Sequence, residues 1–371
     1  MSREDIKEVM YKWFKLKDMI PSDVIMATAL AASFPGDPVW LLVGGPPGSG
    51  KTELVRAFPE GPHATAIDSM TKYSLVSGLK VSGKEETFGM IENLDGKVLL
   101  IKDLTVMLEK LSGRPEDNFF SQLRAAYDGE YAAFHGSGHR RQAYKARFGV
   151  IAAVTPVVDR FRAMNSALGE RFLTIRVDVD PAEVIEQSQN NYGKEEEMRQ
   201  EISHATTMTL NEYRDIGMDS GIPLVQEPDL GKMRSLANLL GHMRTEVPRD
   251  HRHNILYVPK PEVGTRIVKQ FTKLANMLNL YEAYDYSKIT RVARDSINPL
   301  RLNVIRTLNT MINASPWEMH TRAEVSLSLT REICEELWML GICDKEDQGK
   351  SSNYSFKSEI MDMFIESEML K

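Results

Sequence analysis

The chain has 371 residues, of which 42% are hydrophobic and 26% charged, and its formal net charge is −6. This length accommodates two or three ordinary domains, and the composition is that of a globular protein rather than a disordered or fibrous one. The negative net charge excludes a general nucleic-acid coat, so any contact with DNA must come from a local basic patch. The two cysteines, Cys334 and Cys343, stand outside any metal-binding pattern, which is typical of a reduced intracellular protein.

The N-terminal stretch predicts two helices, over residues 4–17 and 23–33. Apolar residues such as Ile6, Met10 and Trp13 recur at helical spacing in the first of them. Its acidic residues argue against binding to a membrane surface, so we expect this helix to pack on the body of the protein. The stretch has no apolar secretion signal, and no run in the chain is long enough to span a bilayer. We therefore expect a cytoplasmic protein with no membrane partner.

The strongest motif lies between Val39 and Leu54. An apolar run over 39–43 predicts a buried strand, and the next eight residues match G-x-x-x-x-G-K-[ST] at every fixed position. Glycines let successive N–H groups curl toward phosphate oxygens, and the start of the following helix favours the same anion. Lys51 is expected to contact the β- and γ-phosphates of ATP, and the Thr52 hydroxyl to hold Mg²⁺. The predicted nucleotide-binding residues are Gly45, Pro46, Pro47, Gly48, Ser49, Gly50, Lys51, Thr52 and Glu53.

Two further strands follow, over 64–67 and 98–101. The first ends at Asp68, and the second is followed by Lys102 and Asp103. Because the carboxyl ends of parallel strands meet at one edge, the second strand has the form of a Walker B segment, with Asp103 as a ligand of Mg²⁺. The alternative is an ordinary strand that happens to end in an aspartate.

A helix over 116–127 precedes a predicted β-hairpin over 131–147, with Gly136-Ser137-Gly138 at its turn. The hairpin carries Arg140, Arg141 and Lys145, and no acid stands between residues 134 and 148. It is therefore the best candidate for a contact with a nucleic-acid backbone. A merely solvated hairpin is the alternative.

Two more strands are predicted over 148–154 and 174–179. Thr155 follows the first of them and is placed to contact the γ-phosphate or the attacking water. Arg171 stands just before the second strand, with no obvious local partner. The alternative for Arg171 is a surface arginine paired with Glu170.

The chain then becomes rich in helices, the strongest over 195–213 and 265–280, and Arg266 lies in the first turn of the latter. Three helices over 300–312, 322–327 and 330–340, followed by a hairpin over 341–356, predict a winged helix. Thr330 is expected to cap the last of these helices. Its acids Glu332, Glu335 and Glu336 are unfavourable for lying along DNA, so contact with a protein or with the edge of a duplex is an equal alternative.

Together these features resemble the AAA+ ATPases. The stretch from Leu123 to Phe172 is similar to the minichromosome maintenance helicases and their relatives, which carry a hairpin before sensor 1, and the chain also resembles ATP-binding proteins of phages and mobile elements. The resemblance implies an α/β fold with a parallel P-loop NTPase sheet. It implies four parts: N-terminal helices over 1–34, an AAA+ core over 35–180, a helical lid over 181–295 and a winged helix over 296–371.

The resemblance also implies roles for single residues. Lys51 and Thr52 bind phosphate and Mg²⁺, Asp103 is the Walker B acid, and Thr155 is sensor 1. Arg171 is the arginine finger that acts on the ATP of a neighbouring subunit, and Arg266 is sensor 2. In the helicases the hairpin that corresponds to Arg140, Arg141 and Lys145 points into a central pore.

One departure from the family stands at residue 104. The family has Asp-Glu at Walker B, where the glutamate polarises the attacking water, whereas this chain has Asp103-Leu104. Either another acid replaces the glutamate, with Asp68 as the first candidate, or hydrolysis is slow and ATP acts as a switch. The first hypothesis is therefore a ring-forming, hexameric ATPase that translocates on or remodels DNA. The second is an ATP-gated assembly or loading factor that acts on a protein partner and hardly turns over.

Overall fold

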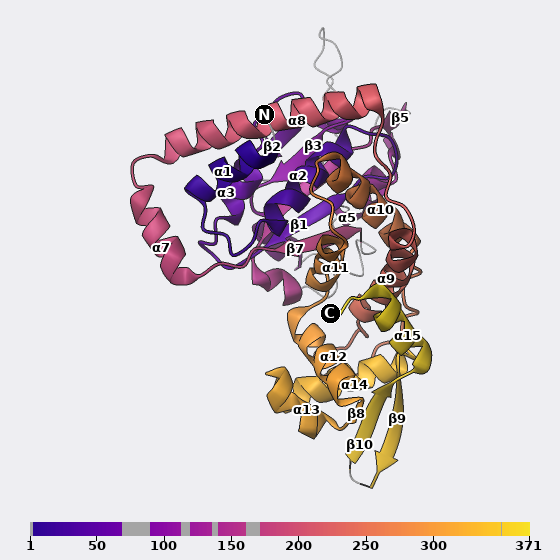
Figure 1. Cartoon of the computed structure of the whole chain (residues 1–371). Helices are drawn as coiled ribbons and strands as arrows, with labels where there is room; N and C mark the ends of the chain where they lie inside the picture. The colour runs from indigo at the N-terminus through magenta and orange to yellow at the C-terminus, as the bar shows by residue number, and fades with distance from the viewer. Residues whose placement is uncertain (1–2, 69–89, 113–118, 136–139, 161–170, 350) are drawn as a thin grey trace. The chain divides into compact units, whose positions relative to one another are not determined.

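The computed structural model describes residues 3–68, 90–112, 119–135, 140–160, 171–349 and 351–371 (Figure 1). The chain forms two compact units. Unit 1 comprises Met1–Leu224 with Lys273–Asp285, and unit 2 comprises Val225–Thr272 with Tyr286–Lys371. These units differ from the predicted division, because the N-terminal helices and part of the expected lid belong with the sheet.

Unit 1 is built on a five-stranded parallel sheet in the order β2-β3-β6-β1-β7. Its strands are β1 (Trp40–Gly44), β2 (Ala64–Ile67), β3 (Val98–Ile101), β6 (Gly149–Val154) and β7 (Phe172–Arg176). Every residue of β1, β3 and β6 is buried, as expected for parallel strands that are covered on both faces. The predicted α/β class with a parallel sheet is thus confirmed, although β7 begins and ends earlier than the predicted strand over 174–179.

One face of the sheet packs around Trp40, which is completely buried. The rings of Tyr127, Phe148 and Phe172 lie with their centroids 5.2, 5.9 and 5.1 Å from that of Trp40. The Trp40 indole N–H donates to the Phe148 carbonyl at 3.0 Å. Two helices complete this core, α4 (Leu104–Ser112) and α5 (Phe119–Tyr127).

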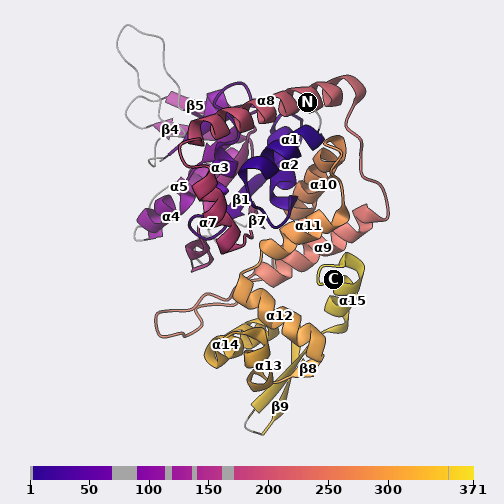
Figure 2. The ribbon, with the colours of Figure 1, turned by 60° about the vertical axis from the view of Figure 1, so that its left-hand side comes forward.

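The other face is covered by α2 (Ile20–Ala32) and α3 (Lys51–Arg56), which contact β1 and β6. The predicted packing of the first helix is confirmed: α1 (Arg3–Trp13) lies against α8 (Glu195–Ser220), in both views of unit 1 (Figures 1 and 2). Residues 14–17 are not helical, in contrast to the prediction. They run instead toward the glycine-rich motif, where residues 14–16 line a cavity together with Gly48, Ser49 and Gly50.

The predicted hairpin is present as β4 (Glu130–His135) and β5 (Arg140–Lys145), which pair antiparallel with Glu130 opposite Lys145. The Ala146 N–H donates to the Gly129 carbonyl at 3.3 Å, and the Gly96 N–H donates to the Arg147 carbonyl at 2.9 Å. These bonds attach the base of the hairpin to the segment just before β3. The hairpin therefore leaves the sheet at the amino-terminal end of β3 and β6.

Unit 2 combines helices with a three-stranded antiparallel sheet in the order β8-β10-β9. Its strands are β8 (Asn313–Ala314), β9 (Cys343–Gln348) and β10 (Ser351–Phe356). Its helices are α9 (Asp229–Arg244), α11 (Tyr286–Asp295), α12 (Pro299–Met311), α13 (Pro316–Ala323), α14 (Leu327–Met339) and α15 (Ser358–Ser367). Helix α10 (Thr265–Leu280) contributes to both units. Within the described part of the chain, none of the helices combines the length and the apolar character needed to cross a membrane.

Two helix boundaries in unit 2 were predicted wrongly. The helix expected over 322–327 is α13, which begins where Ser315 and Glu318 form a reciprocal capping box and ends at Ala323. The cap of α14 is Ser326, whose side chain accepts from the Leu329 N–H, while Thr330 is buried inside the helix. In both cases a serine just before the helix outcompetes the residue that the apolar pattern alone suggested.

The acids of α14 do not form a free acidic face. Glu336 accepts from Arg301 at 2.7 Å, Glu335 from Arg249 at 2.8 Å, and Glu332 lies 3.0 Å from His253. Arg301 and Glu336 are both almost fully buried. The three acids thus have partners within the same unit, and their predicted effect on DNA binding stays a prediction.

We expect Trp40→Ala to lower the free energy of unfolding of unit 1 by about 3–5 kcal/mol, because it leaves a large cavity and removes three ring contacts. Urea unfolding followed by far-UV circular dichroism measures the change. Tyr11→Ala, on the exposed side of α1, is the control and should change stability by less than about 0.5 kcal/mol. Equal stability of the two variants would contradict this account of the core.

Candidate functional site

The predicted site residues gather at the carboxyl edge of the sheet. β1 ends at Gly44, β6 ends one residue before Thr155, and β3 ends two residues before Asp103. Because β6 lies between β1 and β3, Thr155 stands about 5 Å and Asp103 about 10 Å from the line of β1. This is the edge at which open parallel sheets bind ligands.

The loop that follows β1 is tightly curled. Gly48 and Gly50 have φ of +81° and +79°, in the left-handed region that favours glycine. A Cβ at position 45 would stand only 2.7 Å from the Ser49 hydroxyl oxygen, so a side chain there would displace Ser49. The predicted loop conformation therefore depends on its glycines.

Lys51 and Ser49 direct buried polar groups into this loop. Lys51 is 8% exposed, and its ammonium group donates to the Pro46 carbonyl at 3.1 Å. Burial lowers the pKa of Lys51, and the negative charge of Asp103 partly offsets this effect. The Ser49 hydroxyl is buried without a hydrogen-bond partner in the described part of the chain. An anion bound in the loop would satisfy both groups.

Hydrogen bonds link the ends of β3 and β6 through Thr105, a residue that the sequence analysis did not single out. The Thr105 N–H donates to Asp103 Oδ1 at 3.0 Å. The Thr105 hydroxyl oxygen accepts the Thr155 N–H at 2.9 Å, and the two threonine hydroxyl oxygens lie 3.3 Å apart. The structure thus brings the predicted Walker B acid and sensor 1 together. Only the spacing of a threonine two residues after Asp103 could have indicated this link.

A cavity of about 230 Å³ adjoins the glycines of the loop. Its walls are residues 13–16 of the N-terminal segment, Val179, Val184 of α7 (Pro181–Asn190) and Met198 of α8. Side-chain amides of α7 and of the following turn hold the N-terminal segment in place: Gln187 donates to the Lys12 carbonyl and Asn191 to the Trp13 carbonyl, each at 3.1 Å. The sequence analysis missed this wall, because the non-helical path of residues 14–17 depends on tertiary contacts.

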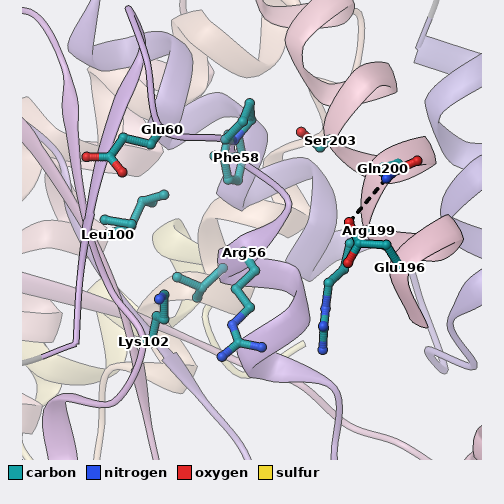
Figure 3. Close-up of a pocket in the computed structure, with 12 residues that line it drawn as sticks. Arg56, Phe58, Glu60, Leu100, Lys102, Glu196, Arg199, Gln200 and Ser203 are labelled. Carbon is teal, nitrogen blue, oxygen red and sulfur yellow. Dashed lines mark hydrogen bonds between the residues drawn. The ribbon is translucent and has the colours of Figure 1, made fainter.

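Glu53, which follows Thr52, connects the loop helix α3 to α8. It accepts two hydrogen bonds from Arg199, both of 3.0 Å, and one from Arg56 at 3.1 Å. Arg199 also lines a second cavity of about 400 Å³ between α3, β3 and α8, where Arg56 and Lys102 lie on the same side (Figure 3). Glu53 therefore attaches α8 to α3 through Arg199, and its predicted role in binding a nucleotide stays a prediction.

Arg171 is buried within its own chain rather than at the surface. It is 7% exposed, its guanidinium carbon lies 5.5 Å from the centre of the Tyr127 ring, and it approaches the Asp128 carboxylate at 3.5 Å. Phe172 pairs with Trp40, so Arg171 stands at the amino edge of the sheet, at the end opposite the loop 45–52. The idea of a surface arginine is therefore wrong. The role of arginine finger stays a prediction, and it requires Arg171 to leave Tyr127.

A second arginine, Arg176, stands at the end of β7 beside Gly44 and was not considered from the sequence. It forms two hydrogen bonds with Asp159, of 2.7 and 3.0 Å. Asp159 follows Thr155 in the chain, so this ion pair crosses from the β6 side to the β7 side of β1. It fixes the segment after Thr155 near the carboxyl end of β1.

Three predicted groups remain: Arg266, Asp68 and the basic residues of the hairpin. Arg266 belongs to unit 2, where it pairs with Glu262 at 3.1 Å, and its role as sensor 2 stays a prediction. Asp68 pairs with Lys102 at 2.9 Å, at the end of the edge strand β2. Arg140 and Arg141 lie on β5, but their side chains fall outside the described residues, whereas Lys145 is exposed.

Mg²⁺ was predicted at Thr52 and Asp103. Within the described residues, no group of three or more His, Cys, Asp or Glu side chains is arranged to hold a metal ion. A hydroxyl and one carboxylate nevertheless suit Mg²⁺, which keeps several waters and takes further oxygens from substrate phosphates. Asp103, exposed and oriented by the Thr105 N–H, fits this donor set.

Comparison of the chain with models of protein families finds no match, and comparison with curated protein sequences finds no relative.

We expect Arg171→Ala to lower the free energy of unfolding of unit 1 by about 1–3 kcal/mol, because it removes a desolvated cation–π contact and the packing of the long side chain. Thermal unfolding measures the change, with Arg124→Ala on the exposed side of α5 as the control. A variant that is as stable as the wild type but hydrolyses ATP far more slowly would instead support the predicted arginine finger.

Proposed function

We propose that this chain is an ATPase of the AAA+ type that binds ATP at the loop 45–52. The observation that carries the proposal is a buried lysine inside a curled glycine loop, at the carboxyl end of β1, an inner strand of the parallel sheet. Lys51 supplies positive charge to the β- and γ-phosphates, and the backbone N–H groups of the loop supply hydrogen bonds. Ser49 gains the partner that its buried hydroxyl lacks within the described residues.

The adjoining cavity favours a nucleotide over inorganic phosphate. It begins at Gly48, Ser49 and Gly50, and its walls combine the apolar side chains of Trp13, Phe14 and Val184 with the amide of Gln187. Its volume of about 230 Å³ is below that of pockets for whole ligands, about 300–1,000 Å³. It therefore suits one part of a nucleotide, such as the base.

Phosphoryl transfer needs positioning and charge stabilisation more than covalent chemistry from the protein. Lys51 and the loop N–H groups hold the phosphates, and Thr155 lies at the same edge to orient the γ-phosphate or the water. Thr52 and Asp103 would hold Mg²⁺, which would neutralise the negative charge that develops during phosphoryl transfer.

In this proposal Asp68 does not take the place of the Walker B glutamate, which is replaced by Leu104 in this chain. Leu104 is buried in the core at 2% exposure and offers no oxygen. Asp68 is paired with Lys102, and its strand lies three positions from β1 in the sheet, about 14 Å away.

The proposed action on DNA rests on the hairpin. β4 and β5 leave the amino edge of the sheet, opposite the phosphate-binding loop, and the run of Arg140, Arg141 and Lys145 is basic in a chain of net charge −6. In a ring of six subunits, the number that the resemblance to the helicases implies, this hairpin would face the DNA strand. The helices and small sheet of unit 2 fit a winged helix, which offers a second surface for DNA or for a protein partner.

A second candidate function is an ATP-gated assembly or loading factor that acts on a protein partner. The absence of a carboxylate at residue 104 favours it, because slow hydrolysis would make the bound nucleotide a switch. The rate of hydrolysis separates the two functions.

We expect Lys51→Ala to abolish ATP binding and hydrolysis, because it removes the buried charge that faces the phosphates. Binding of a non-hydrolysable ATP analogue, measured by calorimetry and by the rise in melting temperature, tests the first part. Lys102→Ala, a lysine at the same edge but outside the loop, is the control. Wild-type protein that binds no nucleotide would refute the proposal, and tight binding with negligible Lys51-dependent turnover would favour the switch.

We expect the triple variant Arg140→Ala, Arg141→Ala and Lys145→Ala to lose the stimulation of hydrolysis by DNA while it keeps its basal rate. The physical reason is the loss of phosphate contacts, which should also flatten the dependence of binding on salt. The control removes three cations elsewhere in unit 1: Lys7→Ala, Lys194→Ala and Arg214→Ala. Equal stimulation of both triple variants would remove DNA from the proposal.

A further inference from the structure

Thr105 makes three contacts at the carboxyl edge of the sheet, although it stands beside the place of the missing glutamate. It is 4% exposed and lies in the first turn of α4. Its N–H holds Asp103 Oδ1 at 3.0 Å, and its hydroxyl oxygen receives the Thr155 N–H at 2.9 Å. One residue therefore fixes both the end of β3 and the end of β6.

The hydroxyl groups of Thr105 and Thr155 share one hydrogen bond, with their oxygens 3.3 Å apart. Two hydroxyls carry two protons, and only one of these lies between the two oxygens. Thr155 donates this proton to Thr105, which leaves the two lone pairs of the Thr155 oxygen to accept. Thr155 is half-buried whereas Thr105 is buried, so the Thr155 oxygen is the one that can accept a hydrogen bond at the ligand edge.

We propose that Thr105 is a positioning residue for ATP hydrolysis, an inference that rests on the proposed ATPase function. Thr105 accepts the Thr155 hydroxyl proton and thereby turns the lone pairs of the Thr155 oxygen toward the attacking water, which donates to it. Through its N–H it also holds the Asp103 carboxylate in one orientation. The two threonines thus align the attacking water, which Leu104 cannot do because its side chain has no polar atom.

The chemistry balances without a carboxylate base. The water oxygen bonds to the γ-phosphorus as the bond from phosphorus to the β,γ-bridging oxygen breaks, and ADP keeps that electron pair. The proton of the water passes to an oxygen of the departing phosphate. Since the transition state is loose, alignment of the water and stabilisation of charge contribute most of the rate.

The test compares Thr105→Val, which keeps the shape of the side chain, with Thr105→Ser, which keeps the hydroxyl. We expect Thr105→Val to lower kcat about tenfold or more, since a directly acting hydrogen-bond donor is worth about 10²–10³ in kcat. The affinity for a non-hydrolysable ATP analogue should stay within about twofold of wild type, and Thr105→Ser should restore most of the rate. Thr206→Val is the matched control, because this buried threonine hydroxyl in α8 has no hydrogen-bond partner in the described residues.

A double-mutant cycle with Thr155→Val separates alignment from a general loss of structure. If Thr105 acts through Thr155, the double variant is no slower than Thr155→Val alone. Losses that multiply, or an unchanged kcat in Thr105→Val, overturn the inference. Wild-type protein without Lys51-dependent hydrolysis would overturn the proposed ATPase as well, whereas Lys51-dependent hydrolysis that Thr105→Val leaves unchanged overturns only the role of Thr105.

Discussion

The parallel pairing of β1 with β6 and β7 is the constraint on which the candidate site depends. Trp40 pairs with Val150 and with Phe172, and the same register continues to Gly44, Val154 and Arg176 at the other end. A shift of one residue would turn buried side chains toward the opposite face. The aromatic cluster around Trp40 therefore fixes, at the amino edge, which residues meet the glycine loop 45–52 at the carboxyl edge.

The carboxyl edge combines charge with hydrogen bonds between neighbouring strand ends. Burial lowers the pKa of Lys51 and the charge of Asp103 partly offsets this effect, while Thr105 joins Asp103 to Thr155. The Asp103 carboxylate and Thr155 keep their geometry because each forms a hydrogen bond with the buried Thr105, which has little freedom to rotate. This rigidity suits chemistry that needs alignment more than proton transfer.

Unit 2 uses buried ion pairs in a different way. Arg301 is 2% exposed and donates both to the Met243 carbonyl and to Glu336. Two charges removed from water need each other, because loss of one partner leaves an uncompensated buried charge. Charges of α14 that look like surface features in the sequence thus connect α14 to α9 and α12.

Local patterns were enough to predict the glycine loop 45–52, the parallel strands and the hairpin: glycine spacing, apolar runs and alternating arms around a glycine turn. They also indicated that Asp103 and Thr155 lie at one edge, since strand ends in a parallel sheet meet there. The burial of Arg171 against Tyr127, the bridge of Arg176 to Asp159 and the attachment of Asp103 to Thr155 through Thr105 could be found only in the folded chain. These contacts join residues far apart in the chain or depend on side-chain direction, and no local pattern encodes which of several arginines, aspartates or threonines will meet.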